Sequence, residues 1–335
     1  MRKMVKKVTK RIGRAFGASD VMDSLVMARN DIRNLNKRID ELAEESRERE
    51  RKNQETIENL LETIKRTHDI TKIPPAYGDE RLIQEGNLIL FKTIKEKLEE
   101  NNIIYFLNFG ILIGMIRHGG FVPWDDDIDI EVPREDFEKL PTLFDKIFKG
   151  TKLKYVNSEI MRVFYGGTPL QLDIFPIDFA EKNLDSEEKS ELKTRLVKYQ
   201  KSLEYNWDNL FLQKEVTLMP YNEMRKKYYK TVQKKNVSFE EANAKKVTVI
   251  NSPESPCYEK TLLWDFEDIF PLRKEKLCGV EVCVPNNIDK VLRLNYGDYY
   301  EYPRDMHKHS DIISRQTAKS IEDIKTIVEA KEIKT

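Results

Sequence analysis

The stretch that decides the fold is FVPWDDDIDIEV, at residues 121–132. Four aspartates fall within five positions of this otherwise apolar run. Strands are depleted in aspartate and neighbouring like charges repel, so local preference and electrostatics both oppose the arrangement. The alternation of acids with Ile and Val in DIDIEV still predicts a strand with one polar and one buried face. We therefore expect a bound partner that offsets the repulsion.

A divalent cation is the partner that this pattern favours. Asp127 and Asp129 are expected on the same face of the strand, because side chains alternate between faces. A hard cation such as Mg²⁺ prefers oxygen ligands and would neutralise both carboxylates. Without it, two unit charges about 4 Å apart repel by about 4 kcal/mol at an effective dielectric of about 20, so the site would tend to hold a proton. An exposed acidic turn after Trp124 is the alternative.

A second apolar strand is predicted at LQLDIFPID, residues 170–178. Asp173 sits between Leu172 and Ile174 and could supply a third carboxylate from a neighbouring position. A buried aspartate in a strand needs a polar partner, and a shared cation would serve all three acids. Asp178, at the end of the same run, is expected to cap the segment that follows.

The remaining pattern alternates helix and strand, then changes character. Residues 183–250 are charged, rich in Lys and Glu and dotted with aromatics, which predicts a helical insertion. This order predicts a mixed α/β or α+β fold. The other expected elements are a helix over 79–102, a strand over 103–108, a short helix over 110–120, a helix over 133–148, strands over 161–167 and 170–178, short strands over 269–287 and a helix from 288.

The first 18 residues are predicted to form a basic amphipathic segment. MRKMVKKVTKRIGRAFG carries seven basic residues and no acidic one. On a helix the apolar residues of this segment share one face, namely Val5, Val8, Ile12 and Phe16. This pattern is typical of a helix that lies on an anionic membrane surface, so residues 1–17 are expected to contact one. A solvated basic tail and a targeting peptide are the alternatives.

Residues 19–70 are predicted to form a coiled-coil stem. Apolar residues repeat in heptads, with Leu25, Ile32 and Ile39 at one core position and Val21, Ala28, Leu35 and Leu42 at the other. A charged run over 45–54 interrupts the seam, and the apolar stripe resumes in a shifted phase at Ile57, Leu60 and Ile64. Few apolar residues flank the seam, so we expect pairing with copies of the same chain. A long helix packed on its own domain is the alternative.

Composition excludes several classes of partner. The 58 basic and 58 acidic residues give a formal net charge of zero, so no global basic field predicts a nucleic-acid partner. Cys257, Cys278 and Cys283 form no CxxC pair and fit reduced thiols in a cytosolic protein. The longest apolar run ends at Arg117, short of the roughly 20 residues of a membrane span, and is expected to be buried core.

The acidic motif and its flanks resemble the signature of the LicD family. The similarity is carried by NFGILIGMIRHGGFVPWDDDIDIEVPREDFEKL at 108–140, LDIFPID at 172–178 and VPNNIDKVLRLNYGDYYEYP at 284–303. This family of phosphocholine and related phosphotransferases shares a core with nucleotidyltransferases and is similar to the fukutin-related ribitol-phosphate transferases. The resemblance implies a nucleotidyltransferase-like mixed sheet flanked by helices, and it matches the helical insertion poorly and the stem not at all. The expected fold class is therefore α+β, with this sheet, a helical insertion and an N-terminal coiled-coil stem.

Carried over residue by residue, the resemblance implies a metal and donor site. Asp127, Asp129 and Asp173 match the residues that bind Mg²⁺ or Mn²⁺ and act in catalysis. The positions implied to contact the donor are Gly110, Gly114, Arg117, His118, Tyr296, Gly297 and Asp298. His118 as a helix cap and residues 296–298 as a tight turn are the alternatives. The family commonly has Gly-Thr where this chain has Gly110-Ile111, so a hydroxyl contact to phosphate is missing.

Four further polar residues have less certain places in this scheme. Asp125 shares strand parity with Asp127 and is expected to support the metal ligands, whereas Asp126 should point elsewhere. His307 and His309 either close over the donor or belong to a surface loop.

The resemblance also implies the reaction. A CDP-linked donor would give up phosphocholine or an alditol phosphate to a hydroxyl of a surface glycan or its lipid-linked precursor, releasing CMP. A nucleotidyltransferase that moves NMP, and a membrane-associated coiled-coil adaptor with an inactive domain, are the alternatives. The expected organisation is a linker at 71–78, a catalytic domain at 79–315 with the insertion at 183–250, and a C-terminal helix or tail at 316–335. A cytoplasmic protein, peripheral at the cytoplasmic face of a membrane, is expected.

Overall fold

A computed structural model describes residues 2–15, 18–203, 205, 219–255, 262–303 and 318–333. The chain divides into two compact units, residues 1–68 and 69–335, which are described separately. His307, His309 and Cys257 lie outside the described residues. Cys278 and Cys283 are free thiols. Within the described ranges no helix is both long and apolar enough to cross a membrane.

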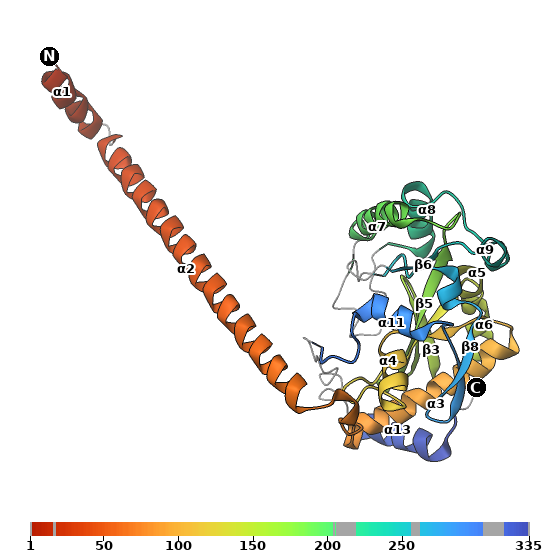
Figure 1. Ribbon diagram of the computed structural model, residues 1–335. Helices are drawn as coiled ribbons and strands as arrows, with labels where there is room; N and C mark the ends of the chain where they lie inside the picture. The colour runs from red at the N-terminus through yellow and green to blue at the C-terminus, as the bar shows by residue number, and fades with distance from the viewer. Residues whose placement is uncertain are drawn as a thin grey trace. The chain divides into compact units, whose positions relative to one another are not determined.

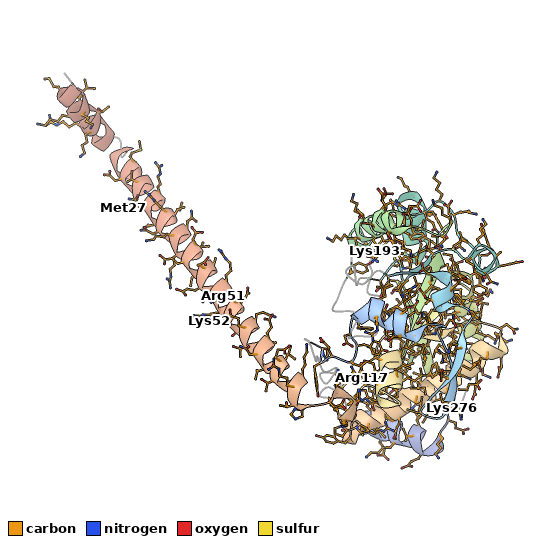
Figure 2. The ribbon with its side chains drawn as sticks, in the orientation of Figure 1. Met27, Arg51, Lys52, Arg117, Lys193 and Lys276 are labelled. Atoms are coloured by element: carbon orange, nitrogen blue, oxygen red, sulfur yellow. The ribbon has the colours of Figure 1, made fainter. Side chains whose placement is uncertain are left out.

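The first unit consists of two helices, α1 (Arg2–Ala15) and α2 (Ala18–Thr67) (Figure 1). Charged side chains of α2, among them Arg51, make ion pairs one turn apart along the helix, for example between Arg51 and Glu48 at 2.9 Å (Figure 2). Large apolar side chains of the unit are exposed, namely Met4, Val5, Val8, Met22, Val26, Met27, Ile32, Leu35, Ile39, Leu42, Ile57, Leu60 and Ile64. The predicted helix is confirmed, and self-pairing stays a prediction.

A seven-stranded mixed sheet forms the centre of the second unit in its described part. Its strands are β1 (Phe106–Leu107), β2 (Asp129–Pro133), β3 (Leu153–Asn157), β4 (Met161–Tyr165), β5 (Gln171–Phe179), β6 (Val249–Asn251) and β7 (Leu263–Trp264). The order is β1-β2-β5-β4-β3, and β6 pairs with the far half of β5 and with β7. Only the β2–β5 pair is parallel among these pairings. The long central strand β5 therefore joins all parts of the sheet.

Helices cover this sheet (Figure 1). They are η1 (Ile70–Lys72), α3 (Gly78–Glu100), α4 (Phe109–His118), α5 (Arg134–Phe137), α6 (Leu140–Ile147), α7 (Ser186–Lys201), α8 (Tyr221–Thr231), α9 (Phe239–Lys245), α10 (Phe266–Ile269), α11 (Ile288–Tyr296) and α13 (Ala318–Ala330). A separate hairpin is formed by β8 (Arg273–Leu277) and β9 (Val280–Val284). The predicted α+β class, a mixed sheet flanked by helices, is confirmed.

Apolar side chains of α3 and of the strands build the main core. Leu90, Ile94 and Leu98 recur on one face of α3 and are fully buried with Ile130 of β2. The helix begins with Asp79 and Glu80, whose negative charges favour a helix N-terminus. A second core lies between α7, α8 and β6, and α7 begins with a capping box made by Asp185 and Glu188. The helices α7, α8 and α9 occupy the predicted insertion.

Two boundaries differ from expectation. Strand β2 begins at Asp129, so Asp127 lies in the irregular segment before it and strand parity does not apply to Asp127. The predicted helix over 133–148 is two helices, α5 and α6, because Pro141 cannot donate a backbone hydrogen bond and starts a new helix.

Candidate active site

Three charged side chains form a row across the middle of the sheet. Asp129 of β2 pairs in register with Asp173 of β5, and Asp173 pairs in register with Arg162 of β4. Neighbouring strands lie about 4.8 Å apart, and directly paired residues project from the same face. The Arg162 Nε atom lies 3.7 Å from Asp173 Oδ2. This row thus contains two of the three predicted metal ligands and an arginine that the sequence did not single out.

Carboxylates gather around Asp129. Burial and the negative charges of Asp127 and Asp173 raise the pKa of Asp129 well above its usual value, with smaller contributions from Asp125 and Glu131. Burial also raises the pKa of Asp125 to about 6, although a hydrogen bond with Asp127 opposes the shift. Asp129 keeps some exposure to solvent. The site therefore concentrates negative charge at a place that a ligand can reach.

Two polar side chains of α3 hold the acidic segment by its backbone. Gln84 Nε2 donates to the carbonyl oxygen of Asp125 at 2.8 Å, and Asn87 Nδ2 donates to that of Asp126 at 2.7 Å. Asn87 Oδ1 accepts a hydrogen bond from the backbone N–H of Gln171, at the start of β5, at 2.9 Å. Both α3 side chains are buried. They couple the acidic segment to β5, the strand that carries Asp173.

Glu131 lies two residues beyond Asp129 on the same side of β2. We call the side of the sheet that carries Asp129, Asp173 and Glu131 the acidic face. The Glu131 Oε1 atom accepts hydrogen bonds from Asn108 at 2.7 Å and from Asn251. Burial raises the pKa of Glu131 to about 8, although both amides oppose the shift. Asn295 of α11 donates to Asn108 Oδ1 at 3.2 Å. This polar chain connects the acidic face to the predicted C-terminal signature through Asn295.

The two predicted donor-site glycines make room for parts of the site itself. A Cβ atom on Gly110 would lie 2.3 Å from Asp125 Oδ2, and one on Gly114 would lie 2.4 Å from the carbonyl oxygen of Gly120. A side chain at Gly114 would displace the backbone of residues 120–122, just before the aspartates, and one at Gly110 would displace the Asp125 carboxylate. These contacts explain both glycines by close packing, and their contact with a donor stays a prediction.

The predicted basic pair is largely engaged within the protein. Arg117 Nη1 donates to the carbonyl oxygen of Tyr299 at 2.7 Å, Arg117 Nε donates to His118 Nε2 at 2.9 Å, and the guanidinium lies over the Trp124 ring. Burial and the adjacent Arg117 charge lower the pKa of His118 to about 4, so its imidazole is neutral at pH 7. Arg117 therefore ties α4 to the C-terminal signature.

Residues 296–298 form the turn at the end of α11. Gly297 has a positive φ of 73°, which favours glycine. Its N–H caps the end of α11 by donating to the carbonyl oxygen of Arg293. Asp298 Oδ1 accepts from the N–H of Tyr300 at 3.1 Å, and Tyr296 is exposed. A donor contact by these residues stays a prediction.

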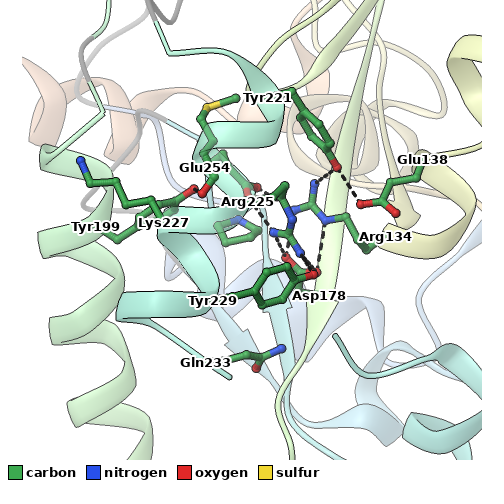
Figure 3. A network of polar contacts seen from close by, with 12 residues as sticks. Arg134, Glu138, Asp178, Tyr199, Tyr221, Arg225, Lys227, Tyr229, Gln233 and Glu254 are labelled. Atoms are coloured by element: carbon green, nitrogen blue, oxygen red, sulfur yellow. Dashed lines mark hydrogen bonds and ion pairs between the residues drawn. The ribbon is translucent and has the colours of Figure 1, made fainter. Parts of the chain in front are cut away.

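Asp178 does not cap the following segment, and that expectation was wrong. It lies fully buried between two arginines, Arg134 and Arg225, with Arg134 Nη2 2.9 Å and Arg225 Nη1 3.1 Å from Asp178 Oδ2 (Figure 3). Glu254 accepts from both arginines, at 2.6 and 2.7 Å. Burial alone would raise the pKa of Asp178, yet the two guanidinium charges hold it below its usual value. We call these four residues the buried ion-pair network.

The chemistry of the acidic face fits a hard divalent cation. Magnesium is commonly bound by one or two carboxylates together with substrate phosphates and water. Asp129 and Asp173, paired in register, supply two such carboxylates. Within the described residues no group of three acidic, histidine or cysteine side chains is arranged as a ready metal site. A complete coordination shell therefore needs oxygens from a substrate, from water or from a moved side chain.

Sequence reasoning missed Arg162, Asn108 and Glu131. Glu131 has the parity of Asp129 within DIDIEV, and that alternation was the available signal. Arg162 lies in an apolar strand, and its place beside Asp173 depends on the register of β4 against β5. No local pattern in the sequence specifies that register.

Comparison with known proteins agrees with this geometry. Residues 102–222 match the family model described as LicD/FKTN/FKRP, nucleotidyltransferase domain. They are a LicD-family domain. The match contains β1 to β5 and so includes the whole Asp129–Asp173–Arg162 row.

Individual relatives share short stretches with this chain. The lipopolysaccharide cholinephosphotransferase LicD of Haemophilus influenzae is 51% identical over 41 residues, which cover 12% of this chain and 16% of that protein. The ribitol 5-phosphate transferase FKRP of Homo sapiens is 31% identical over 86 residues, 26% of this chain and 16% of that protein. An uncharacterized protein of Rickettsia typhi is 38% identical over 81 residues, which cover 22% of this chain and 26% of that protein. The chain thus spans about a quarter or less of the length of these relatives.

Proposed function

We propose that this protein transfers a phosphate-linked substituent, phosphocholine or an alditol phosphate, from a CDP-linked donor to a hydroxyl of a surface glycan or its lipid-linked precursor. The observation that carries the proposal is the pair of carboxylates, Asp129 and Asp173, placed in register on parallel strands inside the LicD-family domain. Two named relatives are a cholinephosphotransferase and a ribitol 5-phosphate transferase, which supports this class of reaction.

The proposed step is a displacement at the phosphorus distal to cytidine. The acceptor hydroxyl oxygen forms a new bond to that phosphorus, the bond from phosphorus to the oxygen of CMP breaks, and CMP leaves with the bonding electron pair. Asp173 accepts the proton of the hydroxyl, because a carboxylate at this place can act within hydrogen-bond reach of the nucleophile. A Mg²⁺ or Mn²⁺ ion held by Asp127, Asp129 and Asp173 would supply positive charge for the non-bridging oxygens and the departing CMP.

The assay that tests this function follows CMP release. The purified full chain is incubated with CDP-choline, CDP-ribitol or CDP-glycerol and candidate glycan acceptors, with Mg²⁺, with Mn²⁺ or with EDTA. We expect acceptor-dependent CMP release that EDTA abolishes. In a parallel incubation with a nucleoside triphosphate in place of the CDP-linked donor, release of pyrophosphate would instead assign the chain as a nucleotidyltransferase.

A matched variant connects the activity to the site. Asp129→Asn keeps the size of the side chain and removes one charge from a crowded group of carboxylates. We expect turnover to fall by about 100-fold or more, because a charge-stabilising group is lost, while the melting temperature stays the same or rises. Unchanged turnover in this variant would contradict the proposal.

We also propose that α2 pairs with α2 of a second copy of this chain. The support is its row of exposed apolar side chains at heptad spacing, including Ile32, Leu35 and Ile39, which a monomer would leave in water. Sedimentation of the full chain should give a mass above that of one copy, and Ile32→Glu with Ile39→Glu should give a single copy. Equal masses for both proteins would contradict the pairing.

Contact of α1 with an anionic membrane, at the cytoplasmic face, is the last part of the proposal. Met4, Val5 and Val8 are exposed on a helix that is otherwise strongly basic. The full chain should sediment with vesicles that contain phosphatidylserine and not with pure phosphatidylcholine vesicles. Val5→Asp with Val8→Asp should weaken this partition, and an unchanged partition would rule out the helix as the anchor.

A further inference from the structure

One nitrogen of the Arg162 guanidinium is fixed by a hydrogen bond to a buried acid. The side chain is 5% exposed, and Nη2 donates to Glu159 Oε1 at 2.6 Å. Glu159 is itself buried and also accepts a hydrogen bond from the hydroxyl group of Ser158. Ser158 and Glu159 lie in the turn between β3 and β4, so this turn and the strand after it fix the orientation of the arginine. The guanidinium is therefore placed before any ligand binds.

The remaining donors of Arg162 are not used inside the protein. Its Nε and Nη1 atoms are buried and have no hydrogen-bond acceptor among the described residues. The Asp173 Oδ2 atom lies 3.7 Å from Nε, which is an ion pair but too long for a good hydrogen bond. A buried donor without an acceptor destabilises the folded protein, and more so when it is charged. Such a cost is typical of a binding residue whose acceptor comes with the ligand.

The charges on this face explain why an arginine is needed there. The largest charge effects on Asp129 come from the carboxylates of Asp127, Asp173 and Asp125. A phosphate that approached these groups without a positive partner would be repelled. Arg162 is a fixed positive charge in register with Asp173, and a guanidinium N–H can donate a charge-assisted hydrogen bond to a phosphate oxygen.

We propose that Arg162 binds the donor phosphate that is transferred, with one of its two diverging donors, Nε or Nη1, donating to a non-bridging oxygen. Glu159 is a positioning residue that orients this guanidinium. The inference rests on the proposed function, because it takes Asp173 as the group beside the attacked phosphorus. A guanidinium next to Asp173 then lies next to the phosphate distal to cytidine. The alternative is that Arg162 serves only as a structural counter-charge for Asp173 and Glu159.

The test measures binding of CDP, inorganic pyrophosphate and CMP to the full chain by calorimetry in Mg²⁺. The variants are Arg162→Gln, Arg162→Lys and Glu159→Gln, together with the double variant Glu159→Gln with Arg162→Gln. The double variant removes both charges of the buried pair and guards against unfolding from an unpaired Glu159. Melting curves accompany each protein.

We expect Arg162→Gln and the double variant to bind CDP and pyrophosphate at least 10-fold more weakly than the wild type, with less than twofold change for CMP. CMP lacks the distal phosphate, so it reports on the rest of the site. Arg162→Lys keeps the charge but loses the planar guanidinium that Glu159 orients, and should fall between wild type and Arg162→Gln. Glu159→Gln keeps the guanidinium, and should lose less affinity for CDP than Arg162→Gln does.

The outcomes separate this inference from the proposed function. If the wild type binds CDP and pyrophosphate and the double variant binds them equally well, Arg162 is a structural counter-charge and the inference is wrong, while the proposed function stands. If the wild type binds pyrophosphate but not CDP, the proposal of a cytidine-linked donor is wrong. The role of Arg162 is then decided by comparing the pyrophosphate affinities of the wild type and the Arg162 variants. If the wild type binds neither, both proposals are wrong.

Discussion

Asp173 and Asp178 lie on the same strand, β5, and face opposite sides of the sheet. Asp178 is enclosed by Arg134 and Arg225 in the buried ion-pair network, where two cations balance two carboxylates (Figure 3). Asp173 shares its face with several carboxylates around Asp129. One aspartate therefore has its charge balanced inside the protein, while the other contributes to an excess of negative charge.

This difference separates a structural acid from a ligand-binding one. The buried ion-pair network joins α5, β5, α8 and the segment after β6, so it docks the helical insertion onto the sheet. The acidic face joins β2, β5 and the segment before β2, and its excess charge favours a cation and an anionic substrate. Substitutions on the two faces should consequently change different properties.

The largest expected effect is on stability, at Asp178. Asp178→Asn removes one carboxylate and leaves Arg134 and Arg225 with a single acid, Glu254. Breaking a buried pair in this way costs about 3–5 kcal/mol, because an uncompensated charge stays buried. Urea unfolding should show this loss. Tyr229→Phe, which removes only a neutral hydroxyl that accepts from Arg225 at 2.8 Å, should cost about 1 kcal/mol. Equal, small losses in both variants would mean that the network does not hold the insertion.

The matching substitution on the other face should spare the fold. Asp173→Asn removes the proposed base and one cation ligand, while Arg162 keeps its pairing with Glu159. CMP release should fall by about 100-fold to 1,000-fold, and the free energy of unfolding should change by about 1 kcal/mol or less. If Asp173→Asn unfolds as readily as Asp178→Asn, the distinction between the two faces is wrong.

Much of the acidic face could be predicted because its signals are local. The acids of DIDIEV and the isolated Asp173 stand out against apolar neighbours, and their strands are short and strongly patterned. The expectation that Asp173 comes from a neighbouring strand agrees with the in-register pairing to Asp129. Asp127 was harder, because the repulsive run of aspartates is irregular up to Asp129 and strand alternation does not extend to it.

The buried ion-pair network could not be predicted because its partners are remote. Asp178 meets Arg225 from the insertion and Glu254 from beyond β6, and neither pairing leaves a mark in the nearby sequence. Arg162 was missed for a related reason, since only the β4–β5 register places it beside Asp173. Local patterns specify elements, whereas charge pairing across a sheet depends on tertiary contacts.

Glu131 is a further buried acid, and a bound proton neutralises it where two arginines neutralise Asp178. Burial raises its pKa from 4.5 to about 8, so the folded protein keeps a proton that the unfolded chain loses above pH 4.5. Its contribution to stability is therefore complete below pH 4.5 and is lost as the pH rises through about 8. Glu131→Gln imitates the protonated acid and should remove this dependence.

Between about pH 5.5 and pH 7 the wild type should lose about 2 kcal/mol of stability relative to Glu131→Gln, since each pH unit across such a gap corresponds to about 1.4 kcal/mol. Urea unfolding in EDTA measures the difference without interference from a cation at Asp129. Asp298→Asn, at an exposed turn, should follow the wild-type curve. Parallel curves for wild type and Glu131→Gln would show that Glu131 is ionised in the folded protein. A carboxylate there would then need a positive partner, as Asp178 does on the opposite face.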